Sequence, residues 1–262
     1  MKRLVLQWIA LCALLVSGAH AAPQSELDAR ATGAYRAEDY AAAAALWNDA
    51  LDAATGALDQ GAPHAGDGER ARLMANLGNC AARQDDWAQA AAWFEASLRL
   101  RPRDAETRDK LDFARSEAGW SPLDRGDLAS TTERALSAFT EDEARWLALV
   151  ALLPLVVTLL GEALRGSRAW RRAALACAAL WLFACTPCIY AAWTADSDPV
   201  LVTNPNGAAA RPEPRESAER LERLPAGTHW KRLDELPGWT RLRGPDGRSV
   251  WVPSRDVFAL ER

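Results

Sequence analysis

The sequence predicts a multi-domain membrane protein with an all-α region, a two-helix transmembrane hairpin and a small all-β barrel. Residues 146–164 and 173–193 are apolar stretches, and at 1.5 Å per residue each is long enough for a hydrocarbon core of about 30 Å. Residues 38–51 and 85–98 repeat one pattern of acidic, aromatic and alanine residues. Short β-branched and aromatic runs separated by Gly and Pro occupy residues 194–262, which is typical of short strands.

Charge and composition exclude several classes of function. Residues 23–122 carry 17 acidic and 11 basic side chains, and residues 194–262 carry 11 of each. Nucleic-acid binding needs a basic stripe, so it is not expected. The five cysteines, three of them in the second apolar stretch, do not form a disulfide framework. We find no catalytic triad, metal-spaced ligand set or phosphate loop, so we expect no enzyme activity, metal or cofactor.

Residues 1–21 have the order of a secretory signal peptide. Lys2 and Arg3 precede an apolar run to Val16, and Ala19-His20-Ala21 is a small-x-small cleavage site. An uncleaved signal anchor is the alternative. Either form exports the segment that follows.

Residues 24–118 are expected to form a helical domain with an internal repeat. In both copies two acidic residues precede an aromatic residue, Tyr40 or Trp87, and an alanine is followed four positions later by Trp47 or Phe94. Side chains four positions apart share one helix face, so they would fill one contact. Tyr40 and Trp87 are 47 positions apart, and residues 55–70 are assigned to an exposed loop between the copies.

The second copy resembles the tetratricopeptide repeat (TPR). The resemblance is carried by Leu77, Gly78, Ala90, Phe94 and Pro102. It implies a solenoid with repeats at about 24–57 and 71–104 and a capping helix at 105–118. The concave face of such a solenoid binds peptides or helices, and the row Arg72, Asn76, Asn79 and Arg83 would grip a carboxylate or backbone there. The alternative is an ordinary solvated helix face.

Residues 121–145 are expected to form an amphipathic connector into the membrane. Thr140 and Glu143 are spaced as a capping box, which predicts a helix from about Glu141. The spans at 146–164 and 173–193 enclose a loop at 165–172 with four arginines. Basic loops stay in the cytoplasm, so both flanking regions are predicted on the periplasmic side of a bacterial inner membrane.

The second span contains Cys185-Thr-Pro-Cys188, which has the form of a thiol exchange motif. Reactive cysteine pairs sit at a helix N-terminus, where the thiol pKa is lowered. This pair is expected late in an apolar helix, so we favour packing by small residues over a redox role.

Residues 194–262 are expected to hold a linker and a β domain with its core at about 200–262. Gly244–Gly247 is a hairpin turn signal. The tail resembles the bacterial SH3 (SH3b) domain through the turn at 224–228, the Gly238-Trp239 pair, the Asp246-Gly247-Arg248 turn and Trp251-Val252. Trp239 and Trp251 could line a peptide groove, with Trp251 as a core residue the favoured alternative.

In its order of parts the chain resembles the BatE-type proteins of bacterial aerotolerance operons. The resemblance implies a membrane-bound accessory protein whose partners carry von Willebrand A domains and work with a MoxR-type ATPase. We therefore expect an envelope scaffold for protein–protein interaction. A peptidoglycan-binding or stress-sensing role through the SH3b-like domain is the alternative.

Overall fold

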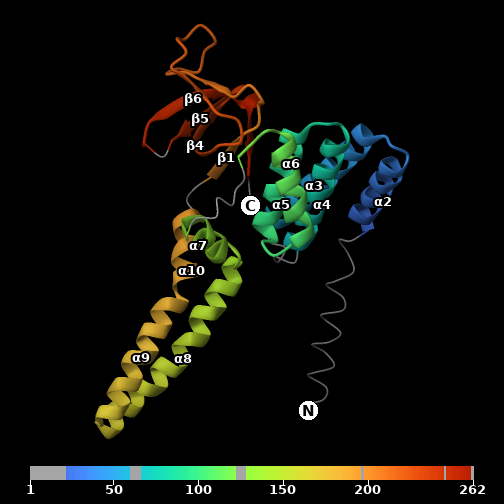
Figure 1. Cartoon of the computed structure of the whole chain (residues 1–262). Coiled ribbons are helices and arrows are strands. Elements are labelled where there is room, and N and C mark those ends of the chain that lie inside the picture. Colours follow the sequence, from blue (N-terminus) through green and yellow to red (C-terminus); the bar gives the residue numbers. More distant parts are fainter. Residues whose placement is uncertain (1–21, 60–65, 122–127, 196–197, 245, 261–262) are drawn as a thin grey trace.

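The computed structural model describes residues 22–59, 66–121, 128–195, 198–244 and 246–260. It contains an array of antiparallel helices, a long helical hairpin and a small antiparallel sheet region (Figure 1). The array from residue 22 to 117 is called the helical module here, and the strands from residue 198 to 259 the β module. The predicted leader, residues 1–21, lies outside the described residues.

The helical module contains α2 (Ala22–Arg36), α3 (Tyr40–Asp59), α4 (Asp67–Arg83), α5 (Trp87–Leu100) and α6 (Ala105–Glu117). Each helix packs on the next one along the chain. The expected loop at 55–70 is shorter than predicted, because α3 runs to Asp59 and α4 begins at Asp67. Asp67 and Glu69 lie in the first turn of α4, where negative side chains are favourable for the helix dipole.

The two sequence copies also have the same local structure. Glu38 and Asp85 both adopt positive φ, at 62° and 59°. The next residue in each copy caps a helix: Asp39 Oδ1 accepts from the backbone N–H of Ala42 at 3.0 Å, and Asp86 Oδ1 accepts from that of Gln89 at 3.1 Å. The 47-residue repeat is therefore structural, down to a backbone conformation that non-glycine residues rarely adopt.

The core of the helical module depends on small residues beneath large aromatic ones. Phe94 is 2% exposed and Trp47 is 4% exposed. A Cβ on Gly78 would lie 2.6 Å from the ring of Phe94, so only glycine lets α4 and α5 come this close. Ala90, four positions before Phe94, is completely buried. Pro102 is half-buried in the α5–α6 turn, where its ring stops the helix.

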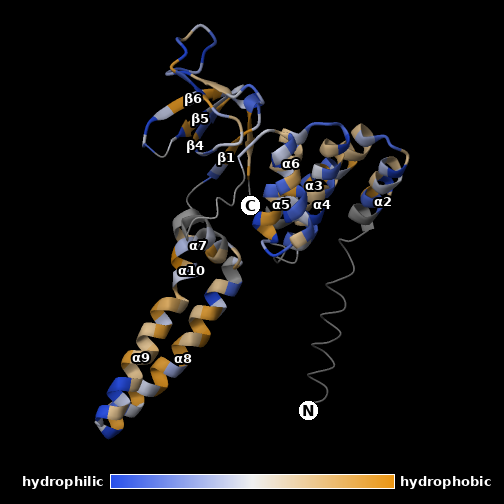
Figure 2. Ribbon diagram, viewed as in Figure 1, coloured by the Kyte–Doolittle hydropathy of each residue, from blue (hydrophilic) through white to orange (hydrophobic). Residues whose placement is uncertain are grey.

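The hairpin contains α8 (Glu141–Arg165), α9 (Arg168–Ala184) and α10 (Thr186–Ala195), with α7 (Leu128–Ser137) packed against α10. Thr140 and Glu143 form the predicted capping box and start α8. Among the described residues, two helices are long and apolar enough to cross a membrane: Glu143–Arg165 and Arg168–Tyr190, with mean hydropathies of 2.3 and 1.8. Large apolar side chains of both helices are exposed, among them Leu153, Val157 and Leu180. Figure 2 shows the hydrophobic colour along α8 and α9.

Two details of the hairpin differ from the prediction. The turn is only Gly166 and Ser167, since Ser167 caps α9 and the helix starts at Arg168. The predicted loop at 165–172 is therefore mostly helix. The second span is divided between α9 and α10 near Pro187, because proline has no N–H to donate. Cys185 keeps a helical backbone there, with φ −79° and ψ −13°, so the chain direction continues.

The β module contains a five-stranded antiparallel sheet in the order β6-β5-β4-β1-β7 and a separate ribbon of β2 and β3. Its strands are β1 (Asp198–Val202), β2 (Ala208–Ala210), β3 (Glu222–Leu224), β4 (His229–Leu236), β5 (Trp239–Arg243), β6 (Ser249–Pro253) and β7 (Val257–Ala259). The predicted turn joins β5 to β6, with Gly247 N–H donating to the Gly244 carbonyl at 3.0 Å. Strand β2 was not predicted, because alanine is a poor strand former.

Candidate functional site

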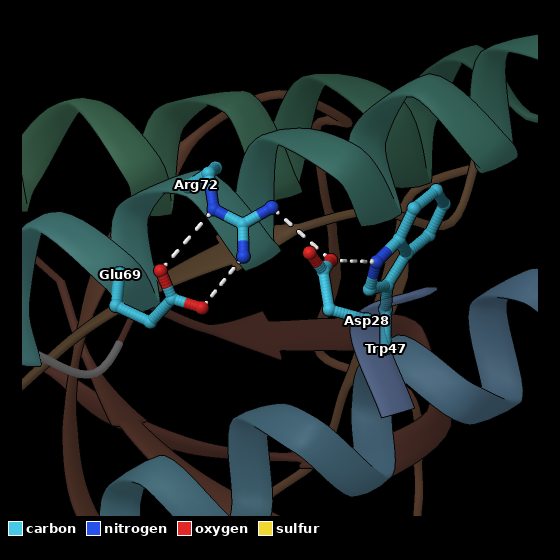
Figure 3. Close-up of polar contacts among 4 residues, drawn as sticks. All are labelled: Asp28, Trp47, Glu69 and Arg72. Atoms are coloured by element: carbon cyan, nitrogen blue, oxygen red, sulfur yellow. Dashed lines mark hydrogen bonds and ion pairs between the residues drawn. The ribbon is translucent and has the colours of Figure 1, made fainter. Parts of the chain in front are cut away.

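Arg72, the first residue of the predicted row on α4, is the centre of a polar network (Figure 3). Its Nε and Nη2 donate to the two carboxylate oxygens of Glu69, at 3.2 and 2.6 Å. Its Nη1 donates to Asp28 Oδ1 at 3.1 Å. Trp47 Nε1 donates to the same oxygen at 2.9 Å. Arg72 therefore joins α4 to Asp28 on α2, and Asp28 in turn joins α3 through Trp47.

The electrostatics of this network bind Arg72 tightly in place. Partial burial acts to raise the pKa of Asp28, but the hydrogen bonds from Arg72 and Trp47 outweigh it and hold that pKa below its ordinary value. The hydrogen bond to Glu69 is the largest effect on Arg72, and it raises the pKa of the guanidinium. The guanidinium of Arg72 already binds the carboxylates of Glu69 and Asp28, so its role in this structure is to stabilise the helical module. Contact with a ligand would fall to the other residues of the row.

The rest of the row continues along α4. Asn76 and Asn79 are half-buried and Arg83 is exposed. Arg83 Nε donates to the hydroxyl of Tyr35 on α2 at 3.4 Å. Residues at spacings of three and four share a helix face, so Asn76, Asn79 and Arg83 present amides and a guanidinium along one side of α4. This side is the part of the predicted row that a ligand could reach.

A groove that the sequence did not predict lies between α3, α4 and α5. Its volume is about 250 Å³, and its lining residues are Ala44, Asn48, Leu77, Ala81, Gln84, Asp86, Gln89 and Trp93. Alanine and leucine form an apolar floor, and three amides with one carboxylate supply hydrogen-bonding groups. No local pattern in the sequence sets these polar residues apart. Only their placement beside alanines, which leave room, could have indicated a groove.

The helical and β modules are joined by a shared apolar core. The rings of Trp93 on α5 and Phe258 on β7 meet edge to face, with centroids 4.7 Å apart. Leu201 and Leu260, which are 0% and 1% exposed, belong to the same buried cluster as the helical residues. Trp93 therefore lines the groove and also touches the β module, so the two features share one side chain.

Polar contacts complete this junction. Arg115 Nη1 on α6 lies 3.5 Å from Glu95 Oε2 on α5, and their side chains are only 5% and 14% exposed. His229, the first residue of β4, contacts the other oxygen of Glu95. Burial lowers the pKa of Arg115, although Glu95 opposes this shift. Trp120 packs on the backbone at Gly227, where a Cβ would lie 2.7 Å from its ring.

Trp239 and Trp251 lie on the outer face of the β5–β6 hairpin. Trp251 pairs across the ladder with Arg241, which lies two positions from Trp239, so the three share a face. The opposite face is the core, because Leu242 and Val252 are both completely buried. The expectation that Trp251 is a core residue is therefore wrong. Guanidinium groups cover both rings, with Arg211 5.7 Å from the Trp239 centroid and Arg241 5.9 Å from that of Trp251.

The described residues contain no group of three His, Cys, Asp or Glu side chains that could hold a metal ion. Burial raises the pKa of the Cys80 thiol to about 11, which keeps it protonated and unreactive at neutral pH. The described candidate features are a polar helix row, a small groove and a pair of tryptophans covered by guanidinium groups. Comparisons with protein-family models, curated proteins and solved structures found no match.

Proposed function

We propose that this protein is a membrane-anchored scaffold that presents two binding modules on one side of a bacterial inner membrane. The main support for this proposal is the junction between the two modules. Trp93 packs on Phe258 across it, and Glu95, which is paired with Arg115, contacts His229. Both modules lie toward the end of the hairpin opposite its arginine turn (Figure 1). A partner would therefore meet the two modules as one surface.

The helical module is proposed to be a TPR-type solenoid. In its favour are the repeated turns at Glu38 and Asp85 and the close approach of Gly78 and Phe94. Its ligand would be a protein segment in contact with Asn76, Asn79 and Arg83 on α4. The β module is proposed to be an SH3b-like barrel, supported by its antiparallel order and its tight β5–β6 turn.

The proposed partners are membrane proteins with von Willebrand A domains, in a complex with a MoxR-type ATPase of the aerotolerance kind. This assignment follows the order of parts in the sequence. Its first test is topology. Cysteine introduced by Asn206→Cys in the β module should react with an impermeant maleimide in intact cells, in a background without the native cysteines. Cysteine introduced by Ala169→Cys, near the arginine turn, should react only after permeabilisation. Labelling of Ala169→Cys in intact cells would reverse the topology.

The second test places a photo-crosslinking residue at position 79, with position 109 on the exposed side of α6 as the matched control. Position 79 should trap a protein with a von Willebrand A domain and position 109 should not. Equal trapping at the two positions, or none from either, would contradict the proposed ligand contact with Asn76, Asn79 and Arg83.

Binding of peptidoglycan by the β module is a second proposal, favoured by the two tryptophans on its outer face. Each ring is stacked on a guanidinium, and such amphipathic surfaces suit extended polar ligands. The full chain in detergent should sediment with purified cell wall, and the double variant Trp239→Ala/Trp251→Ala should stay in the supernatant. Equal sedimentation of both proteins would exclude this role for the tryptophans.

A further inference from the structure

The turn of the hairpin concentrates positive charge. Helix α8 ends at Arg165 and α9 begins at Arg168, with only Gly166 and Ser167 between them. Gly166 has φ 60°, which glycine adopts without strain. Ser167 caps α9 by accepting from the N–H of Trp170 at 3.4 Å. Because the turn is so tight, Arg165, Arg168, Arg171 and Arg172 are held within a short distance of one another.

Two of these arginines have partners within the protein. The ring of Trp170 packs where a Cβ on Gly161 would collide, and Arg165 lies 5.5 Å from the centroid of that ring. Arg171 Nε donates to Glu162 Oε1 at 2.8 Å. Glu162 thus offsets one of the four charges, and the tip keeps a net charge of +3 from four arginines and one glutamate.

The side chains of the other two arginines are free to bind. Arg168 and Arg172 are exposed, and among the described residues neither side chain has a hydrogen-bond or ion-pair partner. They are four positions apart in the first turns of α9, so they lie on one face at a separation of about 5–6 Å between Cβ atoms. A guanidinium binds phosphate oxygens in a bidentate manner. Two such groups on one rigid helix form a site for phosphate anions.

The position of these arginines along the membrane normal indicates which molecules would supply the phosphate group. Each candidate span has 23 residues, about 35 Å of helix, against a hydrocarbon core of about 30 Å. The tip therefore reaches the level of the lipid headgroups. Figure 2 shows the sharp change from apolar helix to polar tip. Trp170 is the residue type that prefers this interface.

We propose that the hairpin tip binds the phosphodiester groups of anionic phospholipids through Arg168 and Arg172. Arg165 and Arg171 supply positive potential from fixed positions, and Glu162 limits it. The inference rests on the proposed membrane crossing of α8 and α9. It adds a lipid preference, and it assigns the two free arginines a role distinct from that of the two paired ones.

The test uses the full chain in mild detergent, with phosphatidylglycerol and phosphatidylcholine added at equal concentration and bound lipids counted by native mass spectrometry. The wild type should retain phosphatidylglycerol in preference. Arg168→Gln/Arg172→Gln should weaken that binding by about fivefold per arginine and leave phosphatidylcholine unchanged. Arg220→Gln/Arg243→Gln, which removes two exposed charges from the β module, is the matched control and should bind as the wild type does.

Glu162→Gln gives a result of the opposite sign, because it releases Arg171 and raises the tip charge. Its binding of phosphatidylglycerol should be tighter than that of the wild type. Equal phosphatidylglycerol binding in the wild type and Arg168→Gln/Arg172→Gln, or an equal loss in the control pair, would overturn the inference. Full competition by soluble glycerophosphoglycerol would also overturn it, because a free phosphate ester would then be the ligand.

Alkaline extraction of membranes separates this inference from the proposed function. If the wild type leaves the membrane in carbonate, the membrane crossing is wrong and the lipid site is rejected with it. If the wild type and Arg168→Gln/Arg172→Gln both stay in the membrane while their lipid counts agree, only the lipid site fails.

Discussion

Replacing Gly78 by alanine tests the closest contact in the helical module. The added Cβ would lie 2.6, 2.7 and 3.0 Å from three atoms of the Phe94 ring, whereas ordinary van der Waals contacts lie at 3.4–4 Å. Phe94 is 2% exposed, so its ring has no open space to enter. Overpacking of this kind costs about 1–3 kcal/mol. Alanine also has a helix propensity about 1 kcal/mol more favourable than that of glycine. The net effect is therefore a loss of about 1 kcal/mol in the free energy of unfolding.

Gly33 supplies the matched control. It also lies inside a helix, α2, but a Cβ there would have nothing within 4 Å. Gly33→Ala should therefore gain helix propensity without a clash. The difference between the two variants removes the propensity term and leaves about 2 kcal/mol, or roughly 4–8 °C in melting temperature. Thermal melts of the full chain in detergent, followed by far-ultraviolet circular dichroism, measure it.

The reasoning fails if Gly78→Ala melts at the same temperature as Gly33→Ala. A double-mutant cycle with Phe94→Leu locates the cause, since a smaller side chain should relieve the clash. The cost of Gly78→Ala should then fall in the Phe94→Leu background. An unchanged cost would place the strain elsewhere.

Four further predictions follow from other contacts. Asp28 has a lowered pKa, so its contribution to stability is present at neutral pH and is lost as the pH falls below about 4; melting temperature against pH should show this loss in the wild type and less of it in Asp28→Asn. Glu38→Gly should raise stability by about 1 kcal/mol, measured by urea unfolding, because glycine relieves the positive φ. Trp93→Ala removes an aromatic pair worth about 0.5–1.5 kcal/mol and should broaden the distance distribution between spin labels on the two modules. Cys80, with a thiol pKa of about 11, should resist iodoacetamide at pH 8 in the native state but not in denaturant, as measured by peptide mass spectrometry.

Each of these predictions has a contradicting outcome. Identical acid profiles for the wild type and Asp28→Asn would remove the Arg72 network as a source of pH dependence. A lower urea midpoint for Glu38→Gly would mean that the glutamate side chain contributes more than its backbone costs. Unchanged label distances in Trp93→Ala would show that the junction does not depend on this ring. Rapid native alkylation of Cys80 would contradict its burial.

Local signals in the sequence predicted much of the fold. The capping box at Thr140 and Glu143 set the start of α8 correctly, because a cap is decided by residues within one turn. The copies around Tyr40 and Trp87 gave the repeat for the same reason. The start of α9 was predicted wrongly, because the four arginines were interpreted as a loop. Ser167, a residue type that often caps helices, caps α9 and starts it at Arg168. Charged side chains indicate exposure to solvent, but they do not exclude a helix.

The candidate site was harder to predict because it depends on distant contacts. The row on α4 was identified by its helical spacing, but the capture of Arg72 by Asp28 joins residues 44 positions apart. Glu95 and His229 are 134 positions apart. Nothing in the local sequence of either residue indicates the other. Strand β2 is a similar case, since its alanines become a strand only through pairing with β3.

The position of β1 has a consequence for how the protein is made. Strand β1 is the first strand after the hairpin, yet it lies between β4 and β7, and β7 is the last strand among the described residues. The sheet can be completed only after β7 has left the ribosome. By then the helical module and both apolar helices have already been synthesised. The complete β module is therefore available to contact α5 only after both apolar helices have been synthesised.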